Sequence, residues 1–432
     1  MIDGVFEMDK KLFETFEKNK DEYLQHLKNL VAIDTQVIGH GILGGKEKEG
    51  QEYIEKLFKE MNADEILKEP MTEEIIQQGF KEYQEGNLGH DYKDRYNVIA
   101  KFKGNPKGKT ILFNGHIDTM PPGDLSKWDE NPHKPYEKDG KLYGLGTTDM
   151  KSGLMASILA VKLLKDAGYE LPGDVTIASV VDEEGGGNGS VAAVLNGHTA
   201  DAAVICEPSD RNIIVAHMGF VFFEVKVRGI ALHSGYKWKG VNAIEKAMKL
   251  IDALNEMEHQ WLMKYKHPLL PPPTLNIGVI EGGTAGSTVP DLCTFKLCLH
   301  YLPNVMNHKQ VVEEVIETIN TRAKGDPWLK DNMPEISIYQ AGGAFETDID
   351  HEFTKLSRET MEDIVGETKL LGGAAGNDAR LYSNILKIPT IIMGPGYSDQ
   401  CHSPNEYVSI EDYFSFIKIY ANLILNWCSN IE

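Results

Sequence analysis

The stretch 175–184 reads Val-Thr-Ile-Ala-Ser-Val-Val-Asp-Glu-Glu, an apolar run that ends in three carboxylates. A short continuous apolar run of this kind is typical of a buried strand. Similar strands are predicted at 97–102, 110–114 and 202–206, with helical segments at 150–167 and 189–196. This alternation predicts an α/β fold, in which a mixed, largely parallel sheet is flanked by helices.

The pattern changes after about residue 213. A half-buried strand (220–228) is followed by a helix (240–256), two strands (274–280 and 294–300), a helix (307–323) and a strand (335–340). The order β-α-β-β-α-β is that of a ferredoxin-like unit. A helix at 351–365, a strand at 390–393 and a helix at 410–427 then resume the first pattern. We therefore predict a discontinuous main domain, 1–212 and 342–432, with an inserted smaller domain at 213–341.

Two helices are predicted before the first strand. Apolar residues recur at helical spacing over the first 35 residues, and a second helix covers about 49–62. Residues 66–94 are polar and show no clear period. We expect them to form an insertion on the surface.

Composition restricts the classes of function. The 432 residues include 44 Lys and Arg against 65 Asp and Glu, which gives a net charge of −21. Such an acidic chain is a poor candidate for binding nucleic acid or an anionic membrane surface. We also expect neither a membrane span nor a signal peptide, because no segment has the required apolar length. The five cysteines, an odd number with no Cys-x-x-Cys pair, indicate a reducing compartment, most simply the cytoplasm.

Two polar motifs lie beside predicted strands and helices. In the segment 113–119, Phe-Asn-Gly-His-Ile-Asp-Thr, residues i and i+2 of an extended backbone point the same way. We expect Asp118 to accept the second ring N–H of His116 and so fix its tautomer. Asp149 directly precedes a predicted helix, where its carboxylate can cap the helix, ligate a metal, or do both.

Further acidic and imidazole side chains follow the ends of predicted strands: Glu183, Glu184, Glu207 and His402. Three adjacent carboxylates at 182–184 can simply be a strand end that solvent covers. The functional interpretation is that a bound cation offsets the repulsion between them. In an open α/β sheet, ligands bind at the carboxyl ends of the strands. Imidazoles and carboxylates that converge there suit Zn²⁺ or a similar divalent ion. There are enough ligands for two metals, with one carboxylate left as a general base.

These motifs resemble the M20-type zinc amidohydrolase/peptidase family, which includes acetylornithine deacetylase, succinyl-diaminopimelate desuccinylase, aminoacylase-1 and carboxypeptidase G2. The resemblance extends over nearly the whole chain and includes Gly-Ile-Ala-Leu-His-Ser-Gly at 229–235 in the inserted domain. It implies two divalent metal ions per chain, for which we expect Zn²⁺, with Co²⁺ or Mn²⁺ also permitted by the ligand types. It also implies that Asp149 bridges the metals, that His116 and Glu207 complete one, and that Glu184 and His402 complete the other.

The resemblance also implies catalytic roles. Glu183 is the general base that takes a proton from the attacking water and returns it to the leaving amine. His233 matches the family's lid histidine, which helps to stabilise the oxyanion and in dimeric members reaches the partner's active site. The alternative for His233 is an ordinary loop histidine.

The sequence departs from the family at the expected substrate clamp. Ser287 stands in the position of a usual Asn, and His300 in the position of a usual Arg. Histidine cannot reproduce the planar fork with which Arg grips a carboxylate. Arg380, in the motif 376–380 that begins at Gly376, is a candidate substitute, and a structural ion pair is an equal alternative.

The sequence therefore predicts an acetylornithine deacetylase-like hydrolase that removes an acyl group from a small N-acylated amine or amino acid. The alternatives are a metallo-dipeptidase or aminopeptidase of the same fold, and a non-catalytic binding protein that retains the fold. The resemblance also implies that 1–212 and 342–432 form the metal-binding catalytic domain, that the inserted domain 213–341 acts as a lid, and that the chain forms a homodimer through this lid domain.

Overall fold

The structure, a computed structural model, describes residues 10–373 and 375–429. The chain divides into two compact units. Unit 1 comprises Met1–Val215, Thr347–Leu371 and Asn377–Glu432, and unit 2 comprises Ala216–Glu346 and Gly372–Gly376. These bounds lie three to five residues beyond the boundaries expected from the sequence. The segment 372–376, assigned above to the main domain, belongs to unit 2.

The main sheet has the strand order β1-β2-β6-β3-β7-β17-β8-β15, and β16 pairs with β8. Its parallel centre consists of β6 (Val175–Val180), β3 (Ile111–His116), β7 (Ala202–Ile205) and β17 (Thr390–Ile392). The flanking strands are antiparallel: β1 (Glu65–Pro70), β2 (Tyr96–Phe102), β8 (Ile213–His217) and β15 (Phe345–Glu346). The short strand β16 covers Leu370–Gly373. The α/β fold with a mixed, largely parallel sheet is therefore confirmed.

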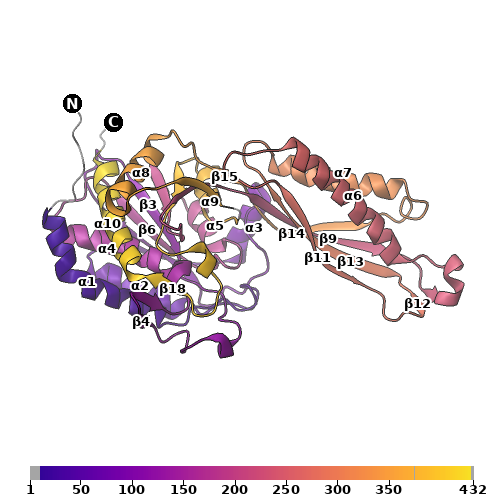
Figure 1. Cartoon of the computed structure of the whole chain (residues 1–432), viewed down its shortest axis with the longest axis horizontal. Coiled ribbons are helices and arrows are strands. Elements are labelled where there is room, and N and C mark those ends of the chain that lie inside the picture. Colours follow the sequence, from indigo (N-terminus) through magenta and orange to yellow (C-terminus); the bar gives the residue numbers. More distant parts are fainter. Residues whose placement is uncertain (1–9, 374, 430–432) are drawn as a thin grey trace. The chain divides into compact units, whose positions relative to one another are not determined.

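Helices cover both faces of this sheet (Figure 1). On one face α4 (Ser152–Asp166) and α10 (Ile410–Cys428) pack on the central strands, with α1 (Lys10–Val31) and α8 (Glu352–Val365) against them. On the other face lie α5 (Asn188–Leu195) and α9 (Ala379–Asn384), with α3 (Glu73–Tyr83) against α5. Helix α2 (Lys48–Glu60) packs on β1 and β2. Because both faces are covered, the central strands are buried along their whole length, as their apolar sequences predict.

The prediction of a surface insertion at 66–94 is wrong. Strand β1 pairs in register with β2 as an edge of the main sheet, and α3 follows it. Edge strands are often polar, because one side faces solvent, so β1 lacked the apolar run that marks the inner strands. Two further side chains of this segment, Glu85 and His90, are buried.

A small antiparallel sheet of three strands also belongs to unit 1. It consists of β4 (Tyr136–Lys138), β5 (Lys141–Tyr143) and β18 (Tyr407–Ser409). The pairing of β5 with β18 brings the segment around residue 145 next to the segment that follows His402. Both segments contribute to the site described below.

Unit 2 contains a four-stranded antiparallel sheet in the order β11-β13-β9-β14. Its elements follow the chain as β9 (Gly219–Arg228), α6 (Ala243–Lys264), β11 (Thr274–Gly282), β13 (Leu292–Tyr301), α7 (His308–Lys324) and β14 (Glu335–Gly342). Alternate residues of β9 and β13 are buried in a core that both helices share. A two-stranded sheet of β10 (Leu232–His233) and β12 (Thr288–Val289) joins two loops of this unit.

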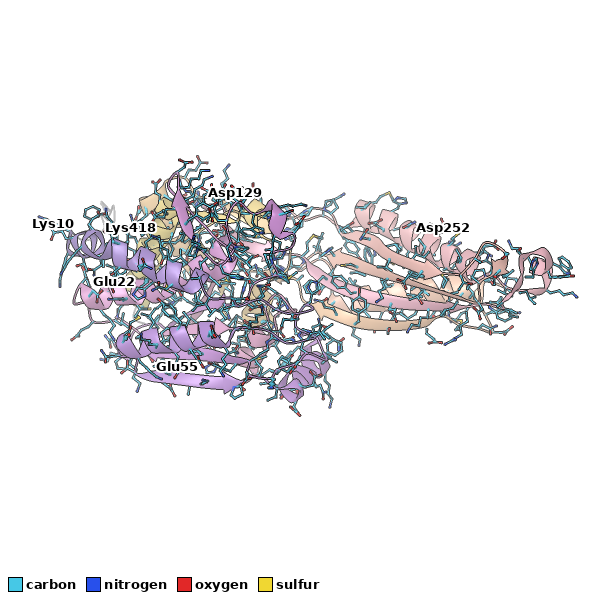
Figure 2. All side chains as sticks on the ribbon, turned by 90° about the horizontal axis from the view of Figure 1, so that it is seen from below. Lys10, Glu22, Glu55, Asp129, Asp252 and Lys418 are labelled. Atoms are coloured by element: carbon cyan, nitrogen blue, oxygen red, sulfur yellow. The ribbon has the colours of Figure 1, made fainter. Side chains whose placement is uncertain are left out.

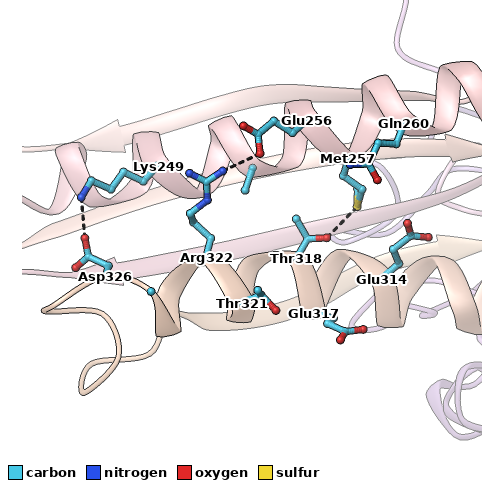
Figure 3. A pocket seen from close by; sticks show the side chains of 12 residues that line it. Lys249, Glu256, Met257, Gln260, Glu314, Glu317, Thr318, Thr321, Arg322 and Asp326 are labelled. Atoms are coloured by element: carbon cyan, nitrogen blue, oxygen red, sulfur yellow. Dashed lines mark hydrogen bonds and ion pairs between the residues drawn. The ribbon is translucent and has the colours of Figure 1, made fainter.

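Charged side chains of both signs, such as Lys10, Glu22 and Glu55, project from the helices of unit 1 (Figure 2). A groove between α6 and α7 of unit 2 is also lined mainly by charged and polar side chains (Figure 3). Several of them pair within the groove, including Arg322 with Glu256 at 2.8 Å. Over residues 10–373 and 375–429, helices long and apolar enough to cross a membrane are absent.

Candidate metal centre

The acidic strand ends meet at one edge of the parallel centre of the main sheet. His116 is the last residue of β3, Glu183 and Glu184 follow β6, and Glu207 follows β7. His402 lies beyond β17, after the short helical turn Ser398–Gln400. Since β6, β3 and β7 are parallel neighbours, the side chains at their carboxyl ends lie close together.

The first group of potential ligands surrounds the buried ring of His116. Its Nε2 atom lies 3.4 Å from Oε1 of Glu207 and 3.9 Å from Oε2 of Glu183. One donor atom of each of these three residues lies within 4.8 Å of the others. The distances allow Glu183 to act either as a ligand or as a free base beside the ligands.

The second group consists of Asp149, Glu184 and His402, which meet the same distance criterion. His402 Nε2 lies 3.0 Å from Oε2 of Glu184 and 3.3 Å from Oδ2 of Asp149. The other oxygen of Asp149, Oδ1, lies 3.1 Å from Nε2 of His116. Asp149 therefore turns one oxygen to each group, which is the arrangement that a carboxylate bridging two metals requires.

Asp118 is the predicted partner of the His116 ring, but it accepts the ring N–H through its backbone carbonyl and not through its carboxylate. Nδ1 of His116 bonds the backbone carbonyl of Asp118 at 2.9 Å, whereas the carboxylate lies 3.7 Å away. The carboxylate instead accepts the backbone N–H groups of Glu183 and Glu184, at 3.2 and 3.1 Å. A backbone carbonyl fixes the ring tautomer as well as a carboxylate does. Asp118 thus holds the turn that carries the two glutamates.

Asp149 does not cap the following helix. It lies in the distorted turn Thr147–Lys151, with a non-helical backbone, and α4 begins only at Ser152. The turn is held by the buried carboxylate of Glu406, which accepts the N–H groups of Gly146, Thr148 and Asp149 at 2.7 to 3.0 Å. This role of Glu406 was not predicted, although the residue lies only four positions after His402.

The charges in the cluster are strongly coupled. Burial raises the pKa of Glu207, to about 7, with the charge of Asp149 adding to the effect. Burial would raise the pKa of Asp149 too, but hydrogen bonds from His116 and His402 hold it well below its usual range. Hydrogen bonds to Asp149 and Glu184 raise the pKa of His402 to about 11. The cluster therefore favours positive charge at its centre, and this donor set of imidazoles and carboxylates fits divalent cations.

Glu183, like Glu207, is a carboxylate whose pKa is raised by its surroundings. Burial and the nearby charge of Asp378 raise its pKa well above the usual value, although His116 opposes the shift. A carboxylate with a raised pKa holds a proton more readily than an ordinary one, as a proton-transfer group requires.

Arg380 lies in unit 1 and is buried. Its guanidinium bonds Glu85 at 2.8 Å, the carbonyl of Asn377 at 2.6 Å and the carbonyl of Gly186 at 3.1 Å. These contacts favour the structural ion pair over the substrate clamp, the two interpretations that the sequence left open.

The other expected substrate residues lie in unit 2. His233 pairs with Thr288 across the two-stranded sheet, and the carbonyl of Ser287 accepts the N–H of Ser234, so the two loops are neighbours. Gly376 packs so closely on Phe220 that a Cβ would come within 2.9 Å of its ring. The buried Nδ1 atom of His300, on β13, has no hydrogen-bond partner among the residues that the structure describes. Burial lowers the pKa of His300, so its ring is uncharged at neutral pH.

A family model that matches most of the chain decides the family. Residues 112–426 match the model of peptidase family M20/M25/M40. The chain belongs to this family. Members hydrolyse amide C–N bonds, and the chain is a hydrolase of that class.

Several members of the M20 family are similar over most of the chain. N-formyl-4-amino-5-aminomethyl-2-methylpyrimidine deformylase of Bacillus subtilis (strain 168) is 32% identical over 361 residues, which cover 77% of this chain and 83% of that protein. Acetylornithine deacetylase of Pasteurella multocida (strain Pm70) is 29% identical over 342 residues, or 78% and 85% of the two chains. The crystal structure of an M20 family metallo-carboxypeptidase from Sulfolobus solfataricus has a TM-score of 0.73 and 21% identity, and covers 94% of this chain and 98% of that one. The structural likeness supports the M20 fold.

Proposed function

We propose that the protein is a two-metal amide hydrolase that removes a small acyl group from the nitrogen of a small substrate. The observation that carries the proposal is the position of Asp149, which turns one carboxylate oxygen to each of two imidazole-containing groups. His116 and Glu207 would hold one ion with Asp149, and Glu184 and His402 the other. When bound, such a pair of ions polarises a carbonyl oxygen and lowers the pKa of a water molecule. The ligand types suit Zn²⁺, with Co²⁺ or Mn²⁺ as alternatives.

Glu183 is the proposed general base. Its carboxylate lies beside both His116 and Glu207, and its backbone is fixed by Asp118. It would take a proton from the attacking water and deliver it to the leaving nitrogen as the C–N bond breaks. The products are a carboxylic acid and an amine. The role of His233 at the oxyanion stays a prediction.

The proposed substrate has no α-carboxylate that an arginine must grip. His300 is uncharged at neutral pH, and Arg380 is already bonded to Glu85 and two carbonyls, so neither offers a free cationic fork. The similarity to a deformylase of an aminomethylpyrimidine supports an N-acylated amine as the substrate class, with formyl or acetyl as the acyl group.

Replacing Glu183 tests the proposal. We expect Glu183→Ala to lower kcat by at least about 100-fold, because a positioned general base contributes roughly 10²–10⁴-fold. Metal content should stay at two ions per chain, because the five proposed ligands remain. Glu359→Gln, an exposed residue of α8, is the control and should leave the rate unchanged. Near-wild-type turnover by Glu183→Ala would remove Glu183 from the mechanism.

Location and assembly are also proposals. All five cysteines are free thiols, which supports a cytoplasmic enzyme. A homodimer formed through unit 2 stays a prediction that sedimentation at micromolar concentration would test.

A further inference from the structure

The turn 182–188, which carries Glu183 and Glu184, is covered by a neighbouring segment of unit 1. This segment, residues 84–95, lies between α3 and β2 and is named the strap below. Its side chains bond to the turn at several points. The strap was part of the region expected to be a surface insertion, and its contacts with the turn were not predicted.

The first contact joins His90 of the strap to Asp182. Nδ1 of His90 lies 2.7 Å from Oδ2 of Asp182, and both side chains are fully buried. Asp182 has a left-handed backbone, with φ of 61°, at the point where the chain leaves β6 for the two glutamates. A non-glycine residue holds this conformation only where its surroundings require it.

Arg95, at the end of the strap, holds the other oxygen of Asp182. Its Nη2 atom lies 2.8 Å from Oδ1, and its Nε atom bonds Glu47 at 3.0 Å. Little space is left around the pair, because a Cβ at Gly41 would come within 2.3 Å of Oδ1 of Asp182. The Asp182 carboxylate is therefore fixed in one position.

Two further contacts hold the far end of the turn. Asn87 of the strap donates through its side chain to the carbonyl of Gly185 at 3.0 Å, and through its backbone N–H to Asn188 at 2.8 Å. Glu85 pairs with Arg380, which in turn donates to the carbonyl of Gly186 at 3.1 Å. The strap thus bonds to the turn directly at 182, 185 and 188, and through Arg380 at 186.

We propose that the strap positions Glu183 and Glu184, and that His90 is its central positioning residue. Asp118 fixes the backbone N–H groups of both glutamates, and the strap fixes the residues on either side of them. Release of either set of contacts would let the turn relax and would move the proposed base and a proposed ligand together. The role of Glu183 in this inference rests on the proposed function, whereas the placement of Glu184 does not require turnover.

The chemistry of His90 offers a sharp test. Among the described residues, its buried Nε2 atom has no hydrogen-bond partner, so the ring uses only Nδ1. An Asn amide places an N–H near the position of Nδ1, whereas Leu fills the space without a donor. His90→Asn should therefore keep the contact with Asp182, and His90→Leu should lose it. His198→Leu is the matched control, because His198 bonds Glu69 at 2.8 Å away from the turn.

The experiment compares these variants with the wild type after loading with Co²⁺. For His90→Leu we expect a changed visible Co²⁺ absorption spectrum, about 10-fold weaker retention of one Co²⁺ ion against a chelator, and about 10-fold lower kcat with KM changed less than about twofold. His90→Asn should keep the wild-type spectrum and stay within about threefold of the wild type in ion retention and kcat. His198→Leu should match the wild type in the spectrum, ion retention and kcat. If His90→Leu fails to fold, Asn87→Ala takes its place and should shift the spectrum in the same direction.

Two results would overturn the positioning role. One is a His90→Leu protein, or its Asn87→Ala substitute, with the wild-type spectrum, ion retention and kcat. The other is a His90→Asn protein as impaired as His90→Leu, which would assign the ring to packing alone. If the wild type binds two ions but releases no amine, the proposed function fails, and the spectrum and ion retention still decide the role of the strap.

Discussion

Asp149 is the residue on which the proposed two-metal arrangement depends. Its Oδ1 atom faces His116 and its Oδ2 atom faces His402, so both groups of ligands need its full carboxylate. An amide in its place would direct an NH₂ group, which cannot ligate a metal, at one of the two groups.

We therefore expect Asp149→Asn to reduce the metal content from two ions per chain to one or fewer. Elemental analysis after dialysis measures this content directly. Asp129→Asn, at an exposed loop position, is the control and should keep both ions. Two tightly held ions in Asp149→Asn would contradict the bridging position.

At the level of single residues, the sequence predicted the potential ligands but not what holds them. His116, Asp149, Glu184, Glu207 and His402 follow strands or precede a helix, and this local signal placed them in one site. The residues that support these ligands carry no such local signal in the sequence. Glu406 bonds backbone N–H groups some 260 positions away, and His90 bonds a carboxylate 92 positions away. Contacts between residues so far apart in the sequence leave no local pattern.

At the scale of elements, the two helices of unit 2 are joined by one buried carboxylate. Asp326, just after α7, accepts hydrogen bonds from Lys246 of α6 and from the N–H groups of Trp328 and Leu329. Lys249 of α6 also donates to it, at 2.8 Å (Figure 3). These contacts tie the end of α7 to α6.

Asp326→Asn should destabilise unit 2 by about 2 kcal/mol, because buried hydrogen bonds to charged groups contribute about 1.5–3 kcal/mol. Hydrogen exchange of α6 and α7 should accelerate accordingly, while that of α4 and α10 in unit 1 stays unchanged. Asp331→Asn, five residues away and exposed, is the control. Unchanged exchange in α7 would show that the ion pairs contribute little.

The same carboxylate predicts a dependence on pH. Burial would raise the pKa of Asp326, but the hydrogen bonds from Lys246 and Lys249 hold it well below the usual value of 3.8. Below about pH 4 the unfolded chain therefore binds a proton that the folded unit does not, and stability falls as the pH falls. Between pH 4 and 2 the unfolding free energy of the wild type should decline more steeply than that of Asp326→Asn. Parallel curves would contradict the low pKa.

The elements that the sequence predicted were those with strong periodicity. The buried strands β3, β6 and β7 and the long helices were recognised, because each carries a complete apolar run or face. Strand β1 and helix α3 were not, because an edge strand and an exposed helix need few apolar residues. The contacts of the strap were not predicted for the same reason, because its sequence shows no apolar pattern.

For the whole molecule, the proposed two-metal site predicts that the stability of unit 1 depends on bound metal. Ligands that bind only the folded state stabilise it, by about 2.7 kcal/mol when present at 100 times Kd. Removal of the metals by a chelator should therefore lower the melting temperature of unit 1 by about 5 °C. The strands β9 and β13 of unit 2 should keep their hydrogen-exchange rates. An unchanged melting temperature after verified metal removal would contradict this coupling.

Amine release by the zinc-loaded wild type tests whether the protein hydrolyses the acyl–nitrogen bond of a small substrate. The panel would hold N-formyl and N-acetyl arylmethylamines, N-acetyl and N-succinyl amino acids, and dipeptides. We predict release of amine and carboxylic acid in equal amounts, fastest from the acylated amines without a carboxylate, and lost on chelation. A protein that holds two metals, cleaves dipeptides and leaves every N-acyl compound intact would contradict the account and would be a peptidase.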